Sequence, residues 1–402
     1  MPATDVVILS AARTPIGRYG GSFKDIHPAE LGAVAARAAI ERAGLTPDDI
    51  DEVLIGHGRQ AGSGPNPGRQ VGHRTGIPPQ APAQTINKAC ASGLQAIVSG
   101  AQSILLGESE IVLAGGIESM SRMPYLIDSA DARWGHRMGN FTLVDAMYRD
   151  GFQCPISNLI MGETAEVLAR QYGITREESD CFAVESQRKA KAATDAGYFA
   201  REIAPVTVTA KAGPTTVERD EHPRGDTSLA SLRKLPLVFG DVDGHPGIIT
   251  AGTSSGITDG GAALVLASAE TARTRGLTPL ARIVGWASAG VDARMMGIGP
   301  VPAIDRLRAR TGLEIGDFDL VELNEAFAAQ VLAVLREKPI ASDRLNVNGG
   351  AIALGHPIGA TGARLVVTLV HELQRRGAHR GLATLCVSGG MGMALAVEML
   401  IG

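Results

Sequence analysis

Cysteine and histidine occur in two segments whose residues suit covalent chemistry. Cys90 lies within residues 87–93, directly before an apolar stretch with helical spacing, so we expect it in the first turn of a helix. Backbone N–H groups and the helix dipole at such a position favour the thiolate, which is the nucleophilic form of cysteine. The alternative is an inert cysteine of the core.

His356 lies in the second segment, residues 346–364, which is dense in glycine and becomes helical in pattern from Thr361. A solvent loop does not need this density of glycine, whereas a loop that closes around a substrate does. An imidazole there could accept the proton of a thiol as a general base. A histidine that only satisfies a backbone carbonyl is the alternative.

Two further polar side chains are expected where strands end. Cys386 ends an apolar strand before the glycine-rich residues 388–392, and it is either a proton-exchanging thiol or a core residue. Asn324 follows another strand and could face a ligand, cap the next helix, or do both. Cys154 and Cys181 are expected to be small hydrophobes of the core. Because no cysteines are spaced as Cys-x-x-Cys, no metal site is predicted.

An internal repeat organises the chain. Residues 44–55 and 312–323 share the same pattern: a Gly-Leu pair directly after a helix, an acidic turn and an apolar strand. Further on, Ser92 falls beside Thr361, and each opens an apolar helix that is followed by a strand ending in Gly-Gly. The pattern predicts two duplicated α/β halves with mostly parallel strands. Cys90 and the loop of His356 would then occupy equivalent places in the two halves, which favours the nucleophile–base interpretation.

The first half carries additional sequence. Residues 1–118 plus 251–275 are predicted to form the N-terminal half, and residues 276–402 the C-terminal half. Residues 119–250 would be an inserted loop domain with helices near residues 164–172, 176–196 and 228–235. We expect this insertion to act as a lid carried on the first half.

Composition limits the possible functions. The chain has 402 residues, of which 50 are glycine and 4% aromatic, so its core must use small aliphatic side chains. A net charge of −4 gives no electrostatic basis for binding nucleic acid or an anionic membrane. No uncharged apolar run of about 18 residues is evident, so no membrane-spanning helix is expected. The absence of a basic, apolar leader before the first strand predicts a cytoplasmic protein.

Several motifs in the same order give the chain its resemblance to a known family. Residues 87–93, 324–328, 355–364 and 386–390 resemble those of the thiolases, and residues 161–166 and 250–252 extend the likeness over nearly the whole chain. The resemblance implies a five-layered αβαβα arrangement of two halves with a loop domain. It also implies a homotetramer or, alternatively, a homodimer.

The implied reaction is the reversible thiolysis of a 3-ketoacyl-CoA, or Claisen condensation in reverse. By resemblance, Cys90 is the acylated nucleophile, and His356 accepts its proton and holds the thioester oxygen. Cys386 is the second acid/base. Asn324 would hold a water at a first oxyanion site, and the backbone amides of Cys90 and Ser388 would form a second. The expected activity is that of an acetyl-CoA acetyltransferase; a broader-chain 3-ketoacyl-CoA thiolase and an inactive acyl-CoA- or lipid-binding relative are the alternatives.

Coenzyme A is expected as a substrate, with no bound cofactor. The resemblance assigns contacts with it to Arg224, Ser231, Ala251 and Ser255. The chain departs from the family pattern at Ser388 (usually glycine), residues 253–254, residues 152–159, and Ile160 (histidine in short-chain members). Met296 matches the short-chain members. The expected length of the acyl chain therefore stays open.

Overall fold

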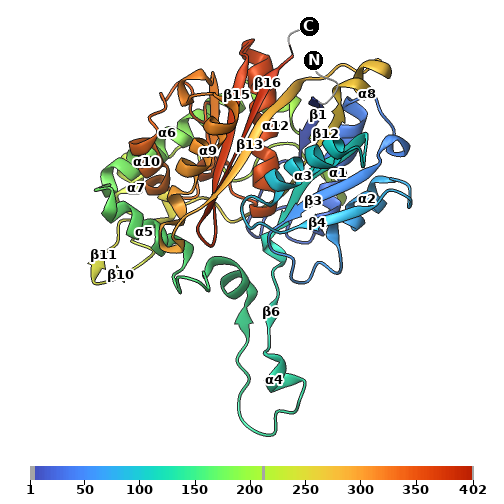
Figure 1. Ribbon diagram of the computed structural model, residues 1–402. Coiled ribbons are helices and arrows are strands. Elements are labelled where there is room, and N and C mark those ends of the chain that lie inside the picture. The colour runs from blue at the N-terminus through green and yellow to red at the C-terminus, as the bar shows by residue number, and fades with distance from the viewer. Residues whose placement is uncertain (1–4, 211–212, 401–402) are drawn as a thin grey trace.

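The computed structural model describes residues 5–210 and 213–400. Expectations about the two chain ends fall on residues 1–4 and 401–402, which lie outside this part. Within it, one continuous sheet is built from two similar halves, and a narrow arm extends from the body (Figure 1).

The N-terminal half-sheet has the strand order β1-β12-β5-β3-β4. Its strands are β1 (Val6–Arg13), β12 (Thr258–Ser268), β5 (Ile111–Ser119), β3 (Glu52–His57) and β4 (Ala83–Ile86). β3 is parallel to β4 and β5, whereas β12 is antiparallel to β1 and β5.

The C-terminal half-sheet repeats this order as β13-β16-β15-β14. Its strands are β13 (Ala281–Gly290), β16 (Met391–Met399), β15 (Arg380–Val387) and β14 (Leu320–Leu323). In the first half, β4 pairs with β3 at the outer edge of the half-sheet. At the equivalent edge of the second half, an isolated parallel bridge joins Val321 to Leu345. The duplication is therefore confirmed.

The expectation of mostly parallel strands is wrong, because each half contains at least two antiparallel pairings. In the C-terminal half, β16 reverses directly after β15 through a short turn. In the N-terminal half, the chain leaves β5 for the insertion and returns as β12 in the opposite direction. Only two residue pairs, Val7–Arg282 and Ile8–Ala281, join the half-sheets between β1 and β13.

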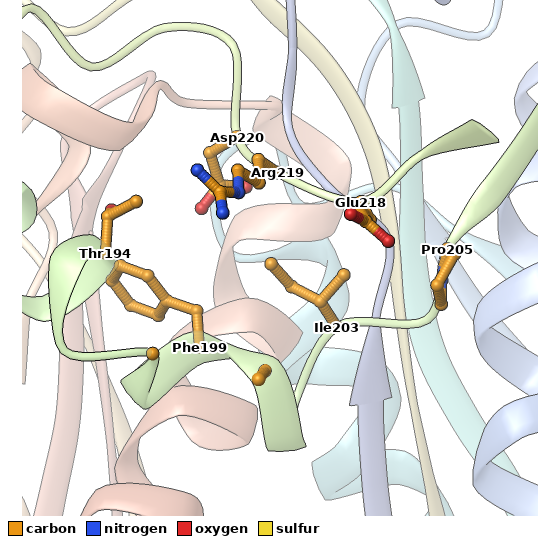
Figure 2. Close-up of a pocket in the computed structure, with 9 residues that line it drawn as sticks. Thr194, Phe199, Ile203, Pro205, Glu218, Arg219 and Asp220 are labelled. Atoms are coloured by element: carbon orange, nitrogen blue, oxygen red, sulfur yellow. The ribbon is translucent and has the colours of Figure 1, made fainter. Parts of the chain in front are cut away.

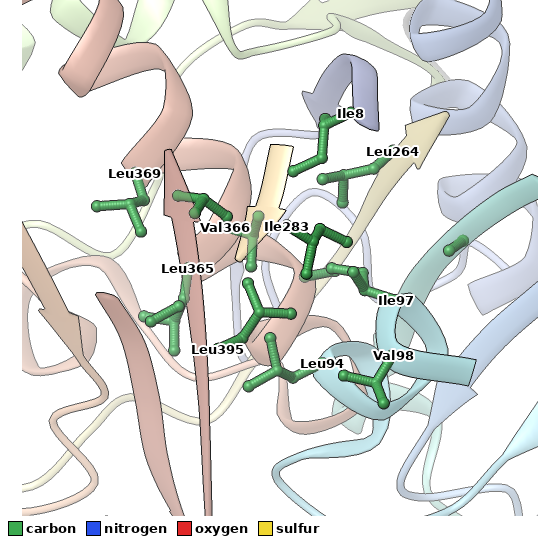
Figure 3. Packing of buried hydrophobic residues seen from close by; sticks show 14 of the residues in the cluster. Ile8, Leu94, Ile97, Val98, Leu264, Ile283, Leu365, Val366, Leu369 and Leu395 are labelled. Atoms are coloured by element: carbon green, nitrogen blue, oxygen red, sulfur yellow. The ribbon is translucent and has the colours of Figure 1, made fainter. Parts of the chain in front are cut away.

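Helices and the two half-sheets form five layers. Helices α1 (Pro28–Arg42) and α2 (Pro67–Thr75) cover the outer face of the first half-sheet, and α9 (Pro300–Thr311) and α10 (Ala328–Glu337) cover the second. The central layer is formed by α3 (Ser92–Leu106) and α12 (Ile358–Arg376). Figure 3 shows Leu94 and Ile97 of α3 and Leu365 of α12 in one apolar cluster with residues of both half-sheets.

Glycine lets the central layer pack at backbone distance. A Cβ on Gly93 would lie 2.9 Å from both the Gly359 carbonyl oxygen and the Ala363 nitrogen. A Cβ on Gly362 would overlap the backbone of Leu94. The glycines near His356 therefore bring the beginnings of α3 and α12 together.

One segment in the described part of the chain, residues 89–106, is long and apolar enough to cross a membrane. This contradicts the expectation that no such uncharged run exists. In the structure, 61% of the segment is buried, and it includes the central helix α3. It therefore serves as a core helix here.

The insertion packs against the C-terminal half. Its helices α5 (Met161–Gln171) and α6 (Arg176–Asp195) contact α10, and α6 also contacts α11 (Ala351–Leu354). The arm carries β6 (Tyr125–Leu126), α4 (Ser129–Ala132) and β7 (Val144–Asp145), and it projects away from the body (Figure 1). The remaining elements are β2 (Gly17–Arg18), β8 (Val206–Ala210), β9 (Gly213–Val217), α7 (Leu229–Leu232), β10 (Asp241–Val242), β11 (His245–Pro246) and α8 (Ala269–Thr274).

Candidate active site

Cys90 lies in a tight turn just before α3, rather than within the first helical turn as expected. Ala89 adopts a φ of 46°, a left-handed conformation that is strained for alanine. Three hydrogen bonds hold this turn: Ala89 N–H donates to Asn87 Oδ1 (3.0 Å), Lys88 N–H donates to Ser92 Oγ (2.9 Å), and Ser92 Oγ donates to the Ala89 carbonyl (2.6 Å). The thiol is therefore placed by a rigid backbone.

His356 is held in one tautomer by its neighbours. Thr361 Oγ1 lies 2.6 Å from His356 Nδ1 and donates its own proton to the Pro357 carbonyl at 3.0 Å. The hydroxyl must then accept from Nδ1–H, so we assign the proton to Nδ1 and the free lone pair to Nε2. Nε2 lies 3.4 Å from Asn324 Nδ2. This arrangement presents a base on the side of Asn324.

Burial sets the protonation state of both candidate reacting groups. Desolvation, with the cations Arg364 and Arg59, lowers the pKa of His356 to about 3, so the imidazole is neutral near pH 7. Desolvation also raises the pKa of Cys90, although Arg59 and the backbone N–H groups of Ser388 and Cys90 oppose this effect. The expected resting thiolate is therefore wrong. At rest, Cys90 is a thiol and His356 a neutral imidazole.

Cys386 lies at the end of β15 and is 1% exposed. It packs in a buried cluster with Cys154, Met161 and Met296. Burial, followed by the charge of a neighbouring Cys90 thiolate, raises the pKa of Cys386 well above its usual range. Cys386 is therefore a protonated thiol that is close enough to Cys90 to sense its charge.

Asn324 is fully buried at the end of β14, where its N–H donates to the Thr384 carbonyl at 3.0 Å. It does not cap the following helix, because α10 begins at Ala328 with Phe327 at its N-cap. Among the described residues, Asn324 Oδ1 has no hydrogen-bond partner. This buried acceptor fits a small polar ligand such as water.

The four predicted coenzyme A contacts lie on segments that touch one another. Arg224, Ser231 and Ala251 are exposed, and Ser255 is half-buried.

The Ser255 N–H donates to the Ala326 carbonyl at 2.9 Å, and the Gly256 carbonyl accepts from His356 N–H at 3.0 Å. The turn after Ala251 thus adjoins both the Asn324 loop and the His356 loop. Around it, Gly252 packs against Leu232 next to Ser231, and Gly256 packs against His222 near Arg224.

Several residues around Cys90 were missed by sequence reasoning. Arg59 and Glu118 are buried near it, and an apolar cluster beside it contains Met120, Met147, Phe152, Ile257 and Ile358. These residues come from five separate segments, so no local motif marks them. Cys154 is buried as predicted, but Cys181 is exposed on α6, which contradicts its assignment to the core.

A separate pocket of about 300 Å³ is lined by Phe199, Ile203 and Asp220 (Figure 2). None of the candidate reacting residues lines it. The carboxylate of Asp220 is already paired with Arg13, whose Nη1 and Nη2 donate at 2.7 and 3.0 Å. This polar edge therefore has a structural role, and the candidate reacting residues Cys90 and His356 stand elsewhere, just before α3 and α12.

Comparison with known proteins decides the family. Residues 6–270 match the family model "Thiolase, N-terminal domain", and residues 277–399 match "Thiolase, C-terminal domain". The chain belongs to the thiolase family. This thiolase is 50% identical over 396 residues to the acetyl-CoA acetyltransferase of Cupriavidus necator, covering 98% of this chain and 99% of that relative.

Solved structures agree with this assignment. The thiolase matches the Bacillus anthracis acetyl-CoA acetyltransferase with a TM-score of 0.95 and 45% identity, covering 98% of this chain and 99% of that one. It also matches human mitochondrial 3-ketoacyl-CoA thiolase in complex with CoA, with a TM-score of 0.94 and 43% identity, covering 99% and 98% of the two chains. The predicted fold class is confirmed.

Proposed function

We propose that this thiolase is an acetyl-CoA C-acetyltransferase, which cleaves acetoacetyl-CoA with coenzyme A and catalyses the reverse condensation of two acetyl-CoA molecules. The observation that carries the proposal is the close packing of the beginnings of the two central helices, since Cys90 and a neutral His356 stand just before them. The names and high identity of the relatives support the same reaction. Coenzyme A and its thioesters are substrates, and no resident cofactor is proposed.

In thiolysis, Cys90 Sγ attacks the 3-keto carbonyl of acetoacetyl-CoA while its proton passes to His356 Nε2. Because the thiol is protonated at rest, this transfer must accompany the attack. The carbon–carbon bond then breaks, leaving acetyl-Cys90 and the enolate of acetyl-CoA. Cys386, whose burial keeps it protonated, donates its proton to the enolate carbon.

Coenzyme A completes the cycle. Its thiol attacks acetyl-Cys90 and gives its proton to the Cys386 thiolate, while the departing Cys90 sulfur recovers a proton from His356. A covalent acyl-cysteine thus divides the exchange into two acyl transfers. Condensation runs through the same steps in reverse.

Two oxyanion sites are proposed. At the first site, His356 and a water bound to the free Asn324 Oδ1 would hold the thioester oxygen of acetyl-CoA when its enolate forms. The backbone N–H groups of Cys90 and Ser388 would hold the oxygen of the acyl group on sulfur. Fixed donors stabilise the developing charge without having to reorganise. Arg224, Ser231, Ala251 and Ser255 are proposed to contact coenzyme A.

The length of the acyl chain separates this proposal from a second candidate, a broader 3-ketoacyl-CoA thiolase. The flexible side chains Met120 and Met147 near Cys90 favour the second candidate, because such a lining can accommodate longer chains. Ile160, where short-chain members carry histidine, favours it by sequence. Thiolysis rates on short, medium and long 3-ketoacyl-CoAs test the choice. A rate that is highest on acetoacetyl-CoA supports the acetyltransferase, and a rate that rises with chain length contradicts it.

A catalytically inactive relative is the remaining alternative. Incubation with acetyl-CoA followed by mass spectrometry should place an acetyl group on Cys90. A chain that binds acyl-CoA without acquiring that group would instead fit an acyl-CoA- or lipid-binding protein.

The assembly proposed is a homotetramer in the cytoplasm, with a homodimer as the alternative. The arm exposes large apolar side chains, of which Trp134 is 80% and Met138 90% exposed. Such side chains on a projecting segment favour burial against another subunit.

A further inference from the structure

We propose that Arg59 is a positioning residue of this reaction: its buried guanidinium fixes one wall of the site and sets an unneutralised positive charge beside Cys90. Only the benefit of this charge to acyl transfer rests on the proposed function. Its physical effect on the Cys90 thiol can be measured without any substrate.

Arg59 follows β3 and is only 6% exposed. Its Nη2 donates to the Gly151 carbonyl at 2.7 Å, and its Nη1 donates to the Asp150 carbonyl at 3.2 Å. A Cβ on Gly151 would lie 2.8 Å from Arg59 Nε, so the guanidinium lies directly against this glycine. Arg59 therefore binds the end of the π-helical turn Tyr148–Phe152.

That turn forms part of the site. Met147 precedes it and Phe152 ends it, and both belong to the cluster that contacts Cys90 and Ile358. Through its two hydrogen bonds, Arg59 holds these side chains in place. The inserted segment is thus fastened to the N-terminal half next to the nucleophile.

The charge of Arg59 is not cancelled by an ion pair. Its two acceptors are neutral carbonyls, its Nε has no hydrogen-bond partner among the described residues, and none of their carboxylates forms a salt bridge with it. Glu118 lies next to Arg59, but its Oε1 accepts from the backbone N–H of Arg59 at 3.2 Å and not from the guanidinium. Its Oε2 accepts from Gly359 N–H at 2.8 Å, and its Oε1 lies 3.1 Å from His57 Nε2.

Charged and titratable groups face Cys90 from every neighbouring element. Those that act on Cys90 are Arg59 after β3, Glu118 on β5 and Cys386 on β15, and those that act on His356 are Arg59 and Arg364 within α12. Arg59 lowers the pKa of Cys90 more than Glu118 raises it, and Arg59 also lowers the pKa of His356. The charge of Arg59 therefore stabilises a thiolate or oxyanion at Cys90 and makes protonated His356 a stronger acid for returning the proton to the departing Cys90 sulfur.

The test compares Arg59→Lys, which keeps the charge, with Arg59→Gln and Arg59→Met, which remove it. Alkylation of Cys90 by iodoacetamide is followed as a function of pH in the full-length protein. Both neutral variants should shift the profile upward by about one pH unit, a roughly tenfold slower reaction on its rising limb, whereas Arg59→Lys should shift it less. Arg188→Met is the control, because Arg188 is an exposed arginine on α6, outside the turn, and its profile should equal that of the wild type.

A second readout needs no variant. The ratio of alkylation rates by the anion iodoacetate and by neutral iodoacetamide should be higher at Cys90 than for free cysteine, and it should fall in Arg59→Gln. Neutral variants with the wild-type profile would overturn the proposal. If neither neutral variant folds, a wild-type ratio at or below that of free cysteine would overturn it. Absence of acetyl-Cys90 in the wild type would refute the proposed function and leave these alkylation results standing.

Discussion

Replacing Thr361 with valine tests how the structure makes His356 a base. The side chains have nearly the same shape, so the change removes the acceptor 2.6 Å from His356 Nδ1 with little change in packing. Thr361 is fully buried, so water cannot easily replace the lost partner. The N–H at Nδ1 is then left unpaired, unless the proton moves to Nε2.

The unpaired N–H costs about 1–3 kcal/mol. The imidazole avoids this cost by adopting the other tautomer once the Asn324 amide turns its unpartnered Oδ1 toward Nε2–H. Nε2 then carries the proton and cannot accept one from Cys90. The productive tautomer then becomes a minor form. Acetylation of Cys90 by acetyl-CoA should slow by about 5- to 150-fold, which is the rate equivalent of that energy.

Rapid quenching and mass spectrometry measure this rate in a single turnover. Thr361→Ser is the matched control, because it keeps the hydroxyl that accepts from Nδ1–H, and it should acylate at close to the wild-type rate. Thermal unfolding of each variant separates loss of fold from loss of function. A folded Thr361→Val enzyme with the wild-type acylation rate would refute the tautomer assignment, and so would a serine variant as slow as the valine variant.

Further predictions concern the reacting residues and the assembly. Cys90→Ala should abolish acetylation and thiolysis while preserving the fold, and acetyl found on Cys386 of the wild type would reverse the assigned roles. Cys386→Ser should still acetylate Cys90 but lose carbon–carbon exchange by orders of magnitude; equal loss in both assays would contradict the division of roles. His356→Asn should lose acylation, because asparagine donates hydrogen bonds but does not accept the proton. The low pKa of His356 means that the unfolded chain binds a proton that the folded chain excludes between about pH 6.5 and 3, so stability falls as pH falls through this window. Thermal unfolding at several pH values should show a shallower loss in His356→Asn, and an unchanged slope would argue against this buried neutral histidine. Sedimentation should give a mass well above the 41.7 kDa subunit, and replacing Trp134 and Met138 with serine should reduce it; a monomeric wild type would contradict the assembly.

The sequence determined the repeat and singled out the candidate reacting residues. Helix periodicity, glycine exits and apolar strands are local patterns, so residues 44–55 and 312–323 revealed the duplication before any contact was known. The same local logic singled out Cys90 at a helix start, which the structure places just ahead of the helix, and His356 on a glycine-dense loop; the duplication predicted equivalent positions for them. The glycines at residues 359 and 362 also indicated close backbone packing from the sequence, because any larger residue there would prevent it.

Tertiary structure decided the properties that depend on distant segments. The local helix dipole argued for a Cys90 thiolate, but desolvation by the surrounding chain outweighs it. The direction of β12 depends on how the insertion returns, and its docking on α10 could not be read from the insertion alone. Arg59 has no motif of its own and becomes part of the site only where residues 150 and 151 fold against it. Local periodicity specifies elements, whereas protonation states and site walls follow from burial and from contacts between residues far apart in the chain.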